Sequence, residues 1–408
     1  MRNSSWKSFA CATLALLGGV EATTTPDLAT LLSKQSNLTT FYTLIKTYPN
    51  ILLQLPSYQG VTILAPNNDA FNKIPYTVLN NAFKNGDEGV ITNVLEYHLL
   101  QGTRTAAELV PGAPVFIPTL LTNETYSNVT GGQVVENVEQ AGNVVIFVSG
   151  QGSRSTLTQA DLAFTGGVVQ VIDSLLIPPG NVTQNTESYN LTSFEGALYK
   201  TKLLETISNA SNVTLFAPQN YGFQALGPAI ANMTVEELTS VMDYHYVANE
   251  VLYSTDLTNG TKILASQGEN ITITHAGNNV YINSAQLLTS DILLANGVMH
   301  VIDNVINPQG PGAQPNPAIG TQGVVFANAT MASDLPFTSD IPCSTSCPVT
   351  TTSSASGSVS AGATTTHSAS KTSTTSFSTS KSKGAGAAKE TGMAWAGLVG
   401  AVGVGLIL

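Results

Sequence analysis

Charged residues are scarce in this sequence. Only 10% of its 408 residues are Asp, Glu, Lys or Arg, whereas a soluble globular chain usually carries about a quarter. The net charge is −11 at pH 7, and no run of basic residues interrupts the acidic balance. Nucleic acid and anionic membrane surfaces are therefore unsuitable partners. Solubility must come from other groups, and the many Ser, Thr and Asn residues are the obvious candidates.

Cysteine is nearly absent. Cys11 falls in the N-terminal segment, and Cys343 and Cys347 lie together in the string PCSTSCP. The long stretch between Cys11 and Cys343 holds no disulfide, so its stability must come from core burial alone. In a secreted chain, two cysteines four positions apart are predicted to form a small local disulfide, or to pair between chains, rather than to bind a metal.

Motifs that carry catalytic chemistry are missing as well. The sequence has no Gly-x-Ser-x-Gly elbow, no His-Glu-x-x-His pair, no Walker glycine loop and no acidic cluster with metal-ligand spacing. Its five histidines leave few ligands for zinc. Asp161 and Asp291 each stand six residues before a glycine, and we interpret them as turn-capping acids. We therefore predict no enzyme activity, no cofactor and no metal.

What the sequence does contain is an internal repeat. Residues 166–180 read GGVVQVIDSLLIPPG, and residues 296–310 read NGVMHVIDNVINPQG. Each copy has a glycine turn, a run of β-branched residues, an acid and a proline. A repeat of this kind fixes the domain plan. The apolar run is too continuous for a half-exposed strand, so it predicts a strand in the middle of a buried sheet that closes each copy.

Two further strings recur in the same order. VTILAPNNDAF (61–71) returns as VTLFAPQNYGF (213–223), and each predicts a buried strand followed by a helix, with an Asn cap in the first copy and a weaker cap in the second. Tyr97-His98 returns as Tyr244-His245, each at a passage from helix to strand. One or two amphipathic helices are predicted ahead of them, between Pro26 and Leu55.

The spacing of the markers differs between the copies. From Tyr97 to Val168 is 71 residues, but from Tyr244 to Val298 is only 54, an excess of 17 in the first copy. We place the excess near residues 120–152, a stretch rich in Asn, Thr and Gly that predicts extended hairpins. As a surface insertion it should leave the core undisturbed. The short link between the copies predicts a restricted joint.

Both ends of the chain resemble processing signals. Residues 1–22 have a positive start, an apolar stretch and a small residue, the layout of a secretory signal peptide. Residues 309–383 are Pro/Gly-rich and then Ser/Thr-rich, which predicts a disordered stalk. Residues 384–408 have small residues, a polar spacer and an apolar tail, the layout of a glycosylphosphatidylinositol (GPI) signal with attachment at Gly384. A true membrane span is the alternative, although the tail is short for one.

Acceptor sequences for N-glycans are abundant. Eleven Asn-x-Ser/Thr sequons follow the signal segment and predict a heavily glycosylated surface. Asn212, at the edge of a buried strand, is a sequon that we expect to be left unused. The acceptor residues are Asn37, Asn123, Asn128, Asn181, Asn190, Asn209, Asn212, Asn232, Asn259, Asn270 and Asn328.

Together these repeated strings resemble the fasciclin domain family. The resemblance covers two modules, residues 24–179 and 182–308. It implies an α+β fold in which each module is a β-sandwich-like wedge with packed helices, used outside the cell in adhesion and in matrix or wall organisation. In animal members the Tyr-His region has been linked to integrin binding, which would single out Tyr97, His98, Tyr244 and His245. The Ser/Thr-rich, nearly proline-free stalk is similar to fungal rather than plant relatives.

Three functional hypotheses follow. The first is a GPI-anchored cell-surface glycoprotein that mediates adhesion or wall organisation, with cell-surface or cell-wall glycans or proteins as partners. The second is a module that binds a small apolar ligand or acts as a hydrolase, displayed on the stalk. The third is a passive wall glycoprotein. For the Tyr-His pairs, the structural alternative is a half-buried histidine satisfied by a hydrogen bond.

Overall fold

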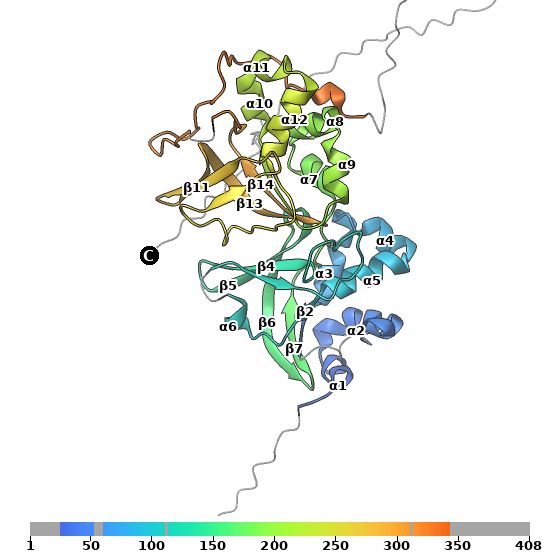
Figure 1. Ribbon diagram of the computed structural model, residues 1–408. Coiled ribbons are helices and arrows are strands. Elements are labelled where there is room, and N and C mark those ends of the chain that lie inside the picture. Colours follow the sequence, from blue (N-terminus) through green and yellow to red (C-terminus); the bar gives the residue numbers. More distant parts are fainter. Residues whose placement is uncertain (1–24, 53–59, 111–112, 311–312, 343–408) are drawn as a thin grey trace, which may run out of the picture. The chain divides into compact units, whose positions relative to one another are not determined.

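The computed structural model describes residues 25–52, 60–110, 113–310 and 313–342 (Figure 1). The predicted signal peptide, the pair Cys343 and Cys347, the Ser/Thr-rich part of the stalk and the GPI attachment at Gly384 lie outside the described residues. The described part belongs to one compact unit that ends at Pro342. Within this unit, two modules follow one another along the chain.

The first module begins with the two helices that its leucine and aromatic spacing predicts. Helix α1 spans Leu28–Ser33, and α2 spans Thr39–Thr47. The Asp27 carboxylate accepts a hydrogen bond from the Thr30 N–H at 2.8 Å and so caps α1. Tyr48 caps the end of α2, directly before Pro49.

The rest of the first module alternates short helices with strands. Its elements are β1 (Val61–Pro66), α3 (Asn68–Asn72), α4 (Asn80–Asn85), α5 (Glu88–Tyr97), β2 (Leu99–Gln101), α6 (Ala106–Leu109), β3 (Val115–Pro118), β4 (Val134–Gln140), β5 (Val144–Val148), β6 (Arg154–Phe164) and β7 (Gly167–Ile172). The Asn67 side chain caps α3 by accepting a hydrogen bond from the Ala70 N–H, as predicted.

The second module repeats this order after a three-helix start. Its elements are α7 (Val182–Ser188), α8 (Thr192–Lys200), α9 (Leu203–Asn209), β8 (Val213–Pro218), α10 (Asn220–Leu226), α11 (Pro228–Ala231), α12 (Val235–Tyr244), β9 (Tyr246–Val247), β10 (Lys262–Leu264), β11 (Asn270–Ala276), β12 (Asn279–Ile282), β13 (Ala285–Leu294) and β14 (Gly297–Ile302). Helix α10 begins after Gln219, which makes no side-chain capping bond, so the predicted weaker cap is confirmed.

Each module holds one seven-stranded sheet, and the two sheets have the same topology. The order is β2-β1-β7-β6-β5-β4-β3 in the first and β9-β8-β14-β13-β12-β11-β10 in the second. One pair in each sheet is parallel, β1 with β7 and β8 with β14. A bridge between Leu100 and Thr119 brings the two ends of the first sheet together, which makes it barrel-like. The predicted repeat and α+β class are confirmed.

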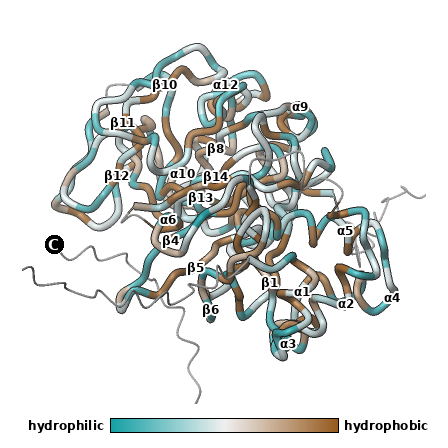
Figure 2. The backbone as a smooth tube through the Cα atoms, turned by 90° about the horizontal axis from the view of Figure 1, so that it is seen from below, coloured by the Kyte–Doolittle hydropathy of each residue, from teal (hydrophilic) through white to brown (hydrophobic). Residues whose placement is uncertain are grey.

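The repeated strands are apolar throughout because both of their faces are buried. In β1, Ile63 belongs to a core shared with the helices, whereas Leu64 belongs to a second core inside the sheet. Leu215 and Phe216 divide in the same way in β8. Figure 2 shows β8, β13 and β14 coloured mostly as hydrophobic. Every core cluster of the described residues draws its members from one module, so the unit contains two separate folds.

Residues 313–342, predicted as the start of the stalk, lie against the second module. The Asp303 carboxylate accepts a hydrogen bond from the Gln322 N–H at 2.8 Å, and the Asn304 side chain donates to the Gln322 carbonyl at 2.6 Å. Phe337 is 6% exposed and packs edge-on against Phe223. The prediction of a disordered stalk is therefore corrected for residues 313–342, because a few apolar and polar anchors hold this irregular segment against the module.

Replacing Phe337 with alanine should destabilise the second module by about 2–4 kcal/mol, the usual cost of emptying a buried aromatic position. Its ring also lies 4.8 Å from the Lys200 ammonium, which would lose that contact. Urea unfolding of the purified chain measures the change. The exposed Val324→Ala serves as a control in the same segment. An unchanged midpoint for Phe337→Ala would show that the segment is not docked.

Candidate functional site: the joint between the modules

The Tyr-His pairs lie where each long helix passes into a strand, as predicted. His98 follows the last residue of α5, and its Nδ1–H donates to the Val94 carbonyl at 2.6 Å. Its Nε2 accepts a hydrogen bond from the Leu176 N–H at 2.9 Å, so the ring ties the helix to the chain beyond β7. His245 repeats both bonds in the second module, to the Val241 carbonyl at 2.7 Å and from the Ile306 N–H at 3.0 Å.

These histidines are held neutral. Both are 0% exposed, and burial lowers the pKa of each to about 4. In a protonated ring Nε2 would carry a hydrogen of its own, so it could no longer accept the hydrogen bond from the backbone N–H. The predicted structural role, a histidine satisfied by hydrogen bonds, is the one that the geometry supports.

The tyrosines of the two pairs are also inside their modules. The Tyr97 hydroxyl donates to the Val134 carbonyl at 2.7 Å, and the Tyr244 hydroxyl donates to the Asn270 carbonyl at 2.8 Å. Both side chains are 0% exposed. Tyr97, His98, Tyr244 and His245 therefore do not reach the surface, and their position corrects the hypothesis that they contact a partner. In both copies the Tyr-His pair connects the long helix, α5 or α12, to the sheet through hydrogen bonds.

The two aspartates interpreted as turn caps lie in strand bulges instead. Asp161 and Asp291 occupy the bulges of β6 and β13 with left-handed φ of 57° and 60°. Gln170 bonds both the Asp161 N–H and its carboxylate, and in the second module His300 accepts from the Asp291 N–H. The turn-capping interpretation is corrected, because each carboxylate accepts a hydrogen bond from the backbone N–H of a distant segment, Ala106 for Asp161 and Ser254 for Asp291.

The insertion of the first copy forms part of the joint between the modules. The predicted hairpin is present as β4 and β5. Most of the excess lies just before it, because residues 119–133 connect β3 to β4, whereas residues 265–269 suffice between β10 and β11. This long connection, which we call the joint loop (residues 119–133), contacts the second module. The insertion thus leaves the core intact, as expected, but it is more than a surface loop.

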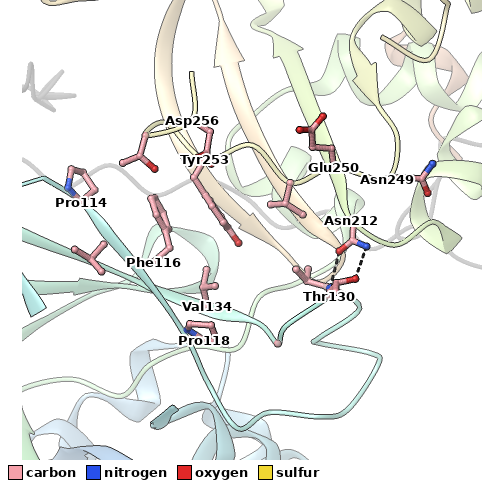
Figure 3. Close-up of a pocket in the computed structure, with 15 residues that line it drawn as sticks. Pro114, Phe116, Pro118, Thr130, Val134, Asn212, Asn249, Glu250, Tyr253 and Asp256 are labelled. Atoms are coloured by element: carbon pink, nitrogen blue, oxygen red, sulfur yellow. Dashed lines mark hydrogen bonds between the residues drawn. The ribbon is translucent and has the colours of Figure 1, made fainter. Parts of the chain in front are cut away.

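Hydrogen bonds from the joint loop reach one end of the second sheet's central strands, where β13 ends and β8 and β14 begin. The Asn128 N–H donates to the Ala295 carbonyl at 2.7 Å, and the buried Gln133 side chain donates to the Leu294 carbonyl at 2.6 Å. Asn212, directly before β8, accepts from the Thr130 N–H at 2.7 Å and donates to the Thr130 hydroxyl at 2.8 Å (Figure 3). These bonds agree with the restricted joint that the short link predicts.

A groove of about 770 Å³ lies beside these bonds. On one side, Phe116 from β3 stacks on Tyr253 of the second module, with ring centroids 4.1 Å apart (Figure 3). The only charged groups among the described lining residues are the acids Glu250 and Asp256. Amide groups of Asn212 and Asn249 add hydrogen-bonding capacity. The groove therefore suits a neutral, polar ligand with apolar faces better than an anion.

Two carboxyl groups from different modules, those of Glu136 and Asp291, influence each other electrostatically. Burial, and then the charge of Asp291, raise the pKa of Glu136 to about 8, while Arg154 opposes the shift. One oxygen of Asp291 is buried without a hydrogen-bond partner. At neutral pH Glu136 therefore binds a proton in the docked unit, and ionising it places like charges together.

Replacing Glu136 with glutamine should stabilise the chain at high pH only. A pKa raised from 4.5 to about 8 means that the folded state binds more protons between these values, so wild-type stability falls as pH rises through this window. We expect the variant to match the wild type at pH 4.5 and to exceed it by about 2 kcal/mol at pH 9, a value reduced for partial exposure. Urea unfolding at both pH values, with the exposed Glu139→Gln as control, measures this difference. A gain of equal size at both pH values would contradict it.

The predicted glycan acceptors divide into two groups. Nine of the eleven asparagines are exposed, and two, Asn128 and Asn212, are half-buried. Both of these belong to the joint. The sequence indicated Asn212 as unusual through its place beside a strand. Gln133, Phe116 and Tyr253 were not predicted, and the only available signal for the joint was that one copy alone carries the insertion.

Within the described ranges, no three His, Cys, Asp or Glu side chains gather closely enough to bind a metal ion. None of the helices in the same ranges has the length and apolar character needed to cross a membrane.

Two modules with the same sheet topology and with exposed glycan acceptors define a tandem-repeat protein. The fasciclin domain model matches residues 36–178 and 189–308, and the chain belongs to the fasciclin family. A fasciclin-like arabinogalactan protein of Arthroderma benhamiae is 34% identical over 72% of this chain and 69% of its own length. Another, from Cercospora beticola, is 27% identical over 61% and 68%. These fungal matches support an extracellular glycoprotein of the adhesion or cell-wall type.

A solved structure is similar too. It is the FAS1 domain pair of the insect cell adhesion molecule Fasciclin I, which is 20% identical and covers 67% of this chain and 98% of that chain, with a TM-score of 0.32.

Proposed function

We propose that this chain is a surface-anchored glycoprotein of the fungal cell wall that serves adhesion or wall organisation. In this proposal the GPI signal at 384–408 tethers it to the membrane, the stalk carries the modules outward, and the groove at the joint binds neutral wall glycan. The supporting observation is the match of both modules to fungal fasciclin-like arabinogalactan proteins.

The charge of the groove favours a neutral glycan over an acidic one. Glu250 and Asp256 are acidic, no basic residue is among the described lining residues, and the whole chain carries −11. An acidic polysaccharide would be repelled at this surface. Amide side chains next to stacked aromatic rings provide the hydrogen bonds and apolar contact that a sugar ring requires.

Release from intact cells tests the anchor. Phosphatidylinositol-specific phospholipase should move the protein into the supernatant, or leave it covalently held in the wall fraction. A chain lacking residues 393–408 should appear in the medium without the enzyme. Full-length protein that stays in the membrane fraction after phospholipase would contradict the proposal.

Binding to wall polysaccharides tests the groove. The released protein should bind insoluble neutral wall glucan, and Asn249→Ala should weaken that binding because Asn249 lines the groove. Asn278 is exposed and lies outside the groove lining, so Asn278→Ala is the matched control. Equal binding by all three proteins would place the partner site elsewhere.

A further inference from the structure

The two half-buried sequons pair with each other across the joint. One is Asn128-Val129-Thr130 in the joint loop, and the other is Asn212-Val213-Thr214 at the start of β8. The hydroxyl of Thr130, which the first sequon needs for recognition, accepts the hydrogen bond of the Asn212 side chain. The Asn212 N–H points back to the Asn128 carbonyl at 3.4 Å. Asn212 Nδ2, the nitrogen to which a glycan would be attached, thus donates one of the hydrogen bonds that join the modules.

The geometry of this contact decides which hydrogen of Asn212 is used. Oδ1 and Nδ2 of Asn212 bond the nitrogen and the hydroxyl of one residue, Thr130, at 2.7 and 2.8 Å. Figure 3 shows the two bonds running side by side. A paired contact of this form uses the Nδ2 hydrogen on the same side as Oδ1. We call this contact the Asn212–Thr130 clasp.

An N-linked sugar would take the place of that hydrogen. Glycosylation turns the side-chain amide into a secondary amide, which strongly prefers the trans form. In that form the sugar carbon lies on the Oδ1 side of Nδ2. The sugar would then stand between Asn212 and Thr130, beside a groove that both residues line.

We propose that N-glycosylation of Asn212 and docking of the two modules exclude each other. The docked chain carries no glycan at Asn212, and a chain modified there cannot close the Asn212–Thr130 clasp. This inference rests on the proposed secretory route, which brings the sequons to the glycosylation machinery. Asn212 is thereby a modification site that determines whether the groove is assembled.

The first module supplies the variant that tests this inference. Gly60 in the first module and Asn212 in the second occupy equivalent positions, directly before β1 and β8. Both have a positive φ, which is 90° for Gly60 and 54° for Asn212. Asn212→Gly therefore keeps the backbone conformation while removing the clasp and the sequon. Asn123→Gln is the matched control, because Asn123 is an exposed acceptor in the same joint loop.

The experiment combines site occupancy with amide exchange on the full chain released from cells. Peptide-N-glycosidase F in ¹⁸O water marks each occupied asparagine, and hydrogen exchange follows the Thr130 N–H, which Asn212 Oδ1 protects. In the wild type we expect a glycan at Asn123, none at Asn212, and slow exchange at Thr130. Asn212→Gly should accelerate Thr130 exchange about tenfold or more. Asn123→Gln should leave it unchanged.

Two results would overturn the inference. One is a chain with a glycan at Asn212 whose Thr130 amide still exchanges slowly. The other is an Asn212→Gly chain that exchanges like the wild type. A fraction occupied at Asn212 that exchanges as fast as the glycine variant would support it. Absence of glycans at every sequon would contradict the proposed extracellular function, while the glycine variant would still decide whether the clasp holds the modules.

Discussion

His98→Ala should destabilise the first module by about 3–5 kcal/mol, and His245→Ala should do the same to the second. Each substitution empties a fully buried site and leaves two backbone groups without their side-chain partner, the Val94 carbonyl and the Leu176 N–H in the first case. A loss of this size is a large part of the stability of a single module. Calorimetry of the full chain should show one lowered transition in each variant.

The loss of stability caused by His98→Ala should also depend on pH. A pKa lowered from 6.5 to about 4 means that the unfolded chain binds more protons between these values. The stability that the neutral ring contributes is therefore complete above pH 6.5 and declines as pH falls toward 4. The difference between wild type and His98→Ala should be smaller at pH 4.5 than at pH 7.

An exposed histidine of the second module provides the control. His275 bonds the Leu257 carbonyl at 2.6 Å but lies at the surface, so His275→Ala should cost at most about 1 kcal/mol. Similar losses for His275→Ala and His245→Ala would contradict the structural role given to the buried rings.

Gly167→Ala and Gly297→Ala should each cost about 3 kcal/mol or more. In the parallel pairs, Gly167 is aligned with Val61 and Gly297 with Val213. A methyl group on either glycine would overlap the carbonyl oxygen of its partner, which is backbone and cannot rotate away. The equal effect follows from the repeat, because both copies bring two backbones together at the same point.

Gly89→Ala is the control for these substitutions. Gly89 is in α5, and the nearest atom to an added methyl group is an Asp87 oxygen at 3.5 Å. Alanine there should leave the chain unchanged or slightly more stable, because it favours the helix. Urea midpoints of the three variants measure the effects. A tolerated Gly167→Ala would mean that the parallel pair does not form as described.

The sequence predicted what depends on local pattern. Asn67 caps a helix, the string from Val61 to Pro66 is a buried strand, and the repeated strings occupy equivalent places in both sheets. These features follow from nearest neighbours and from apolar runs, which the sequence displays directly.

What the sequence could not supply depends on contacts between distant segments. The packing of residues 313–342 on the second module was not predicted, because it depends on Phe337 lying beside Phe223 and against Gly196, whose missing side chain leaves room for the Phe337 backbone. The resemblance to animal relatives singled out the Tyr-His pairs for partner binding, and the sequence alone does not show that all four side chains are buried. The joint was missed because Thr130 and Asn212 lie 82 positions apart.

Cross-linking tests most directly whether the two modules are docked as described. The described residues contain no cysteine, so in a background with Cys343 and Cys347 changed to serine, Phe116→Cys with Tyr253→Cys creates a single reporter pair at the joint. A short bismaleimide should link the two within one chain, whereas a pair at the exposed Tyr76 and Leu264 should not link. If the Phe116→Cys and Tyr253→Cys pair links only between chains, or does not link at all, the docked arrangement on which the groove depends is contradicted.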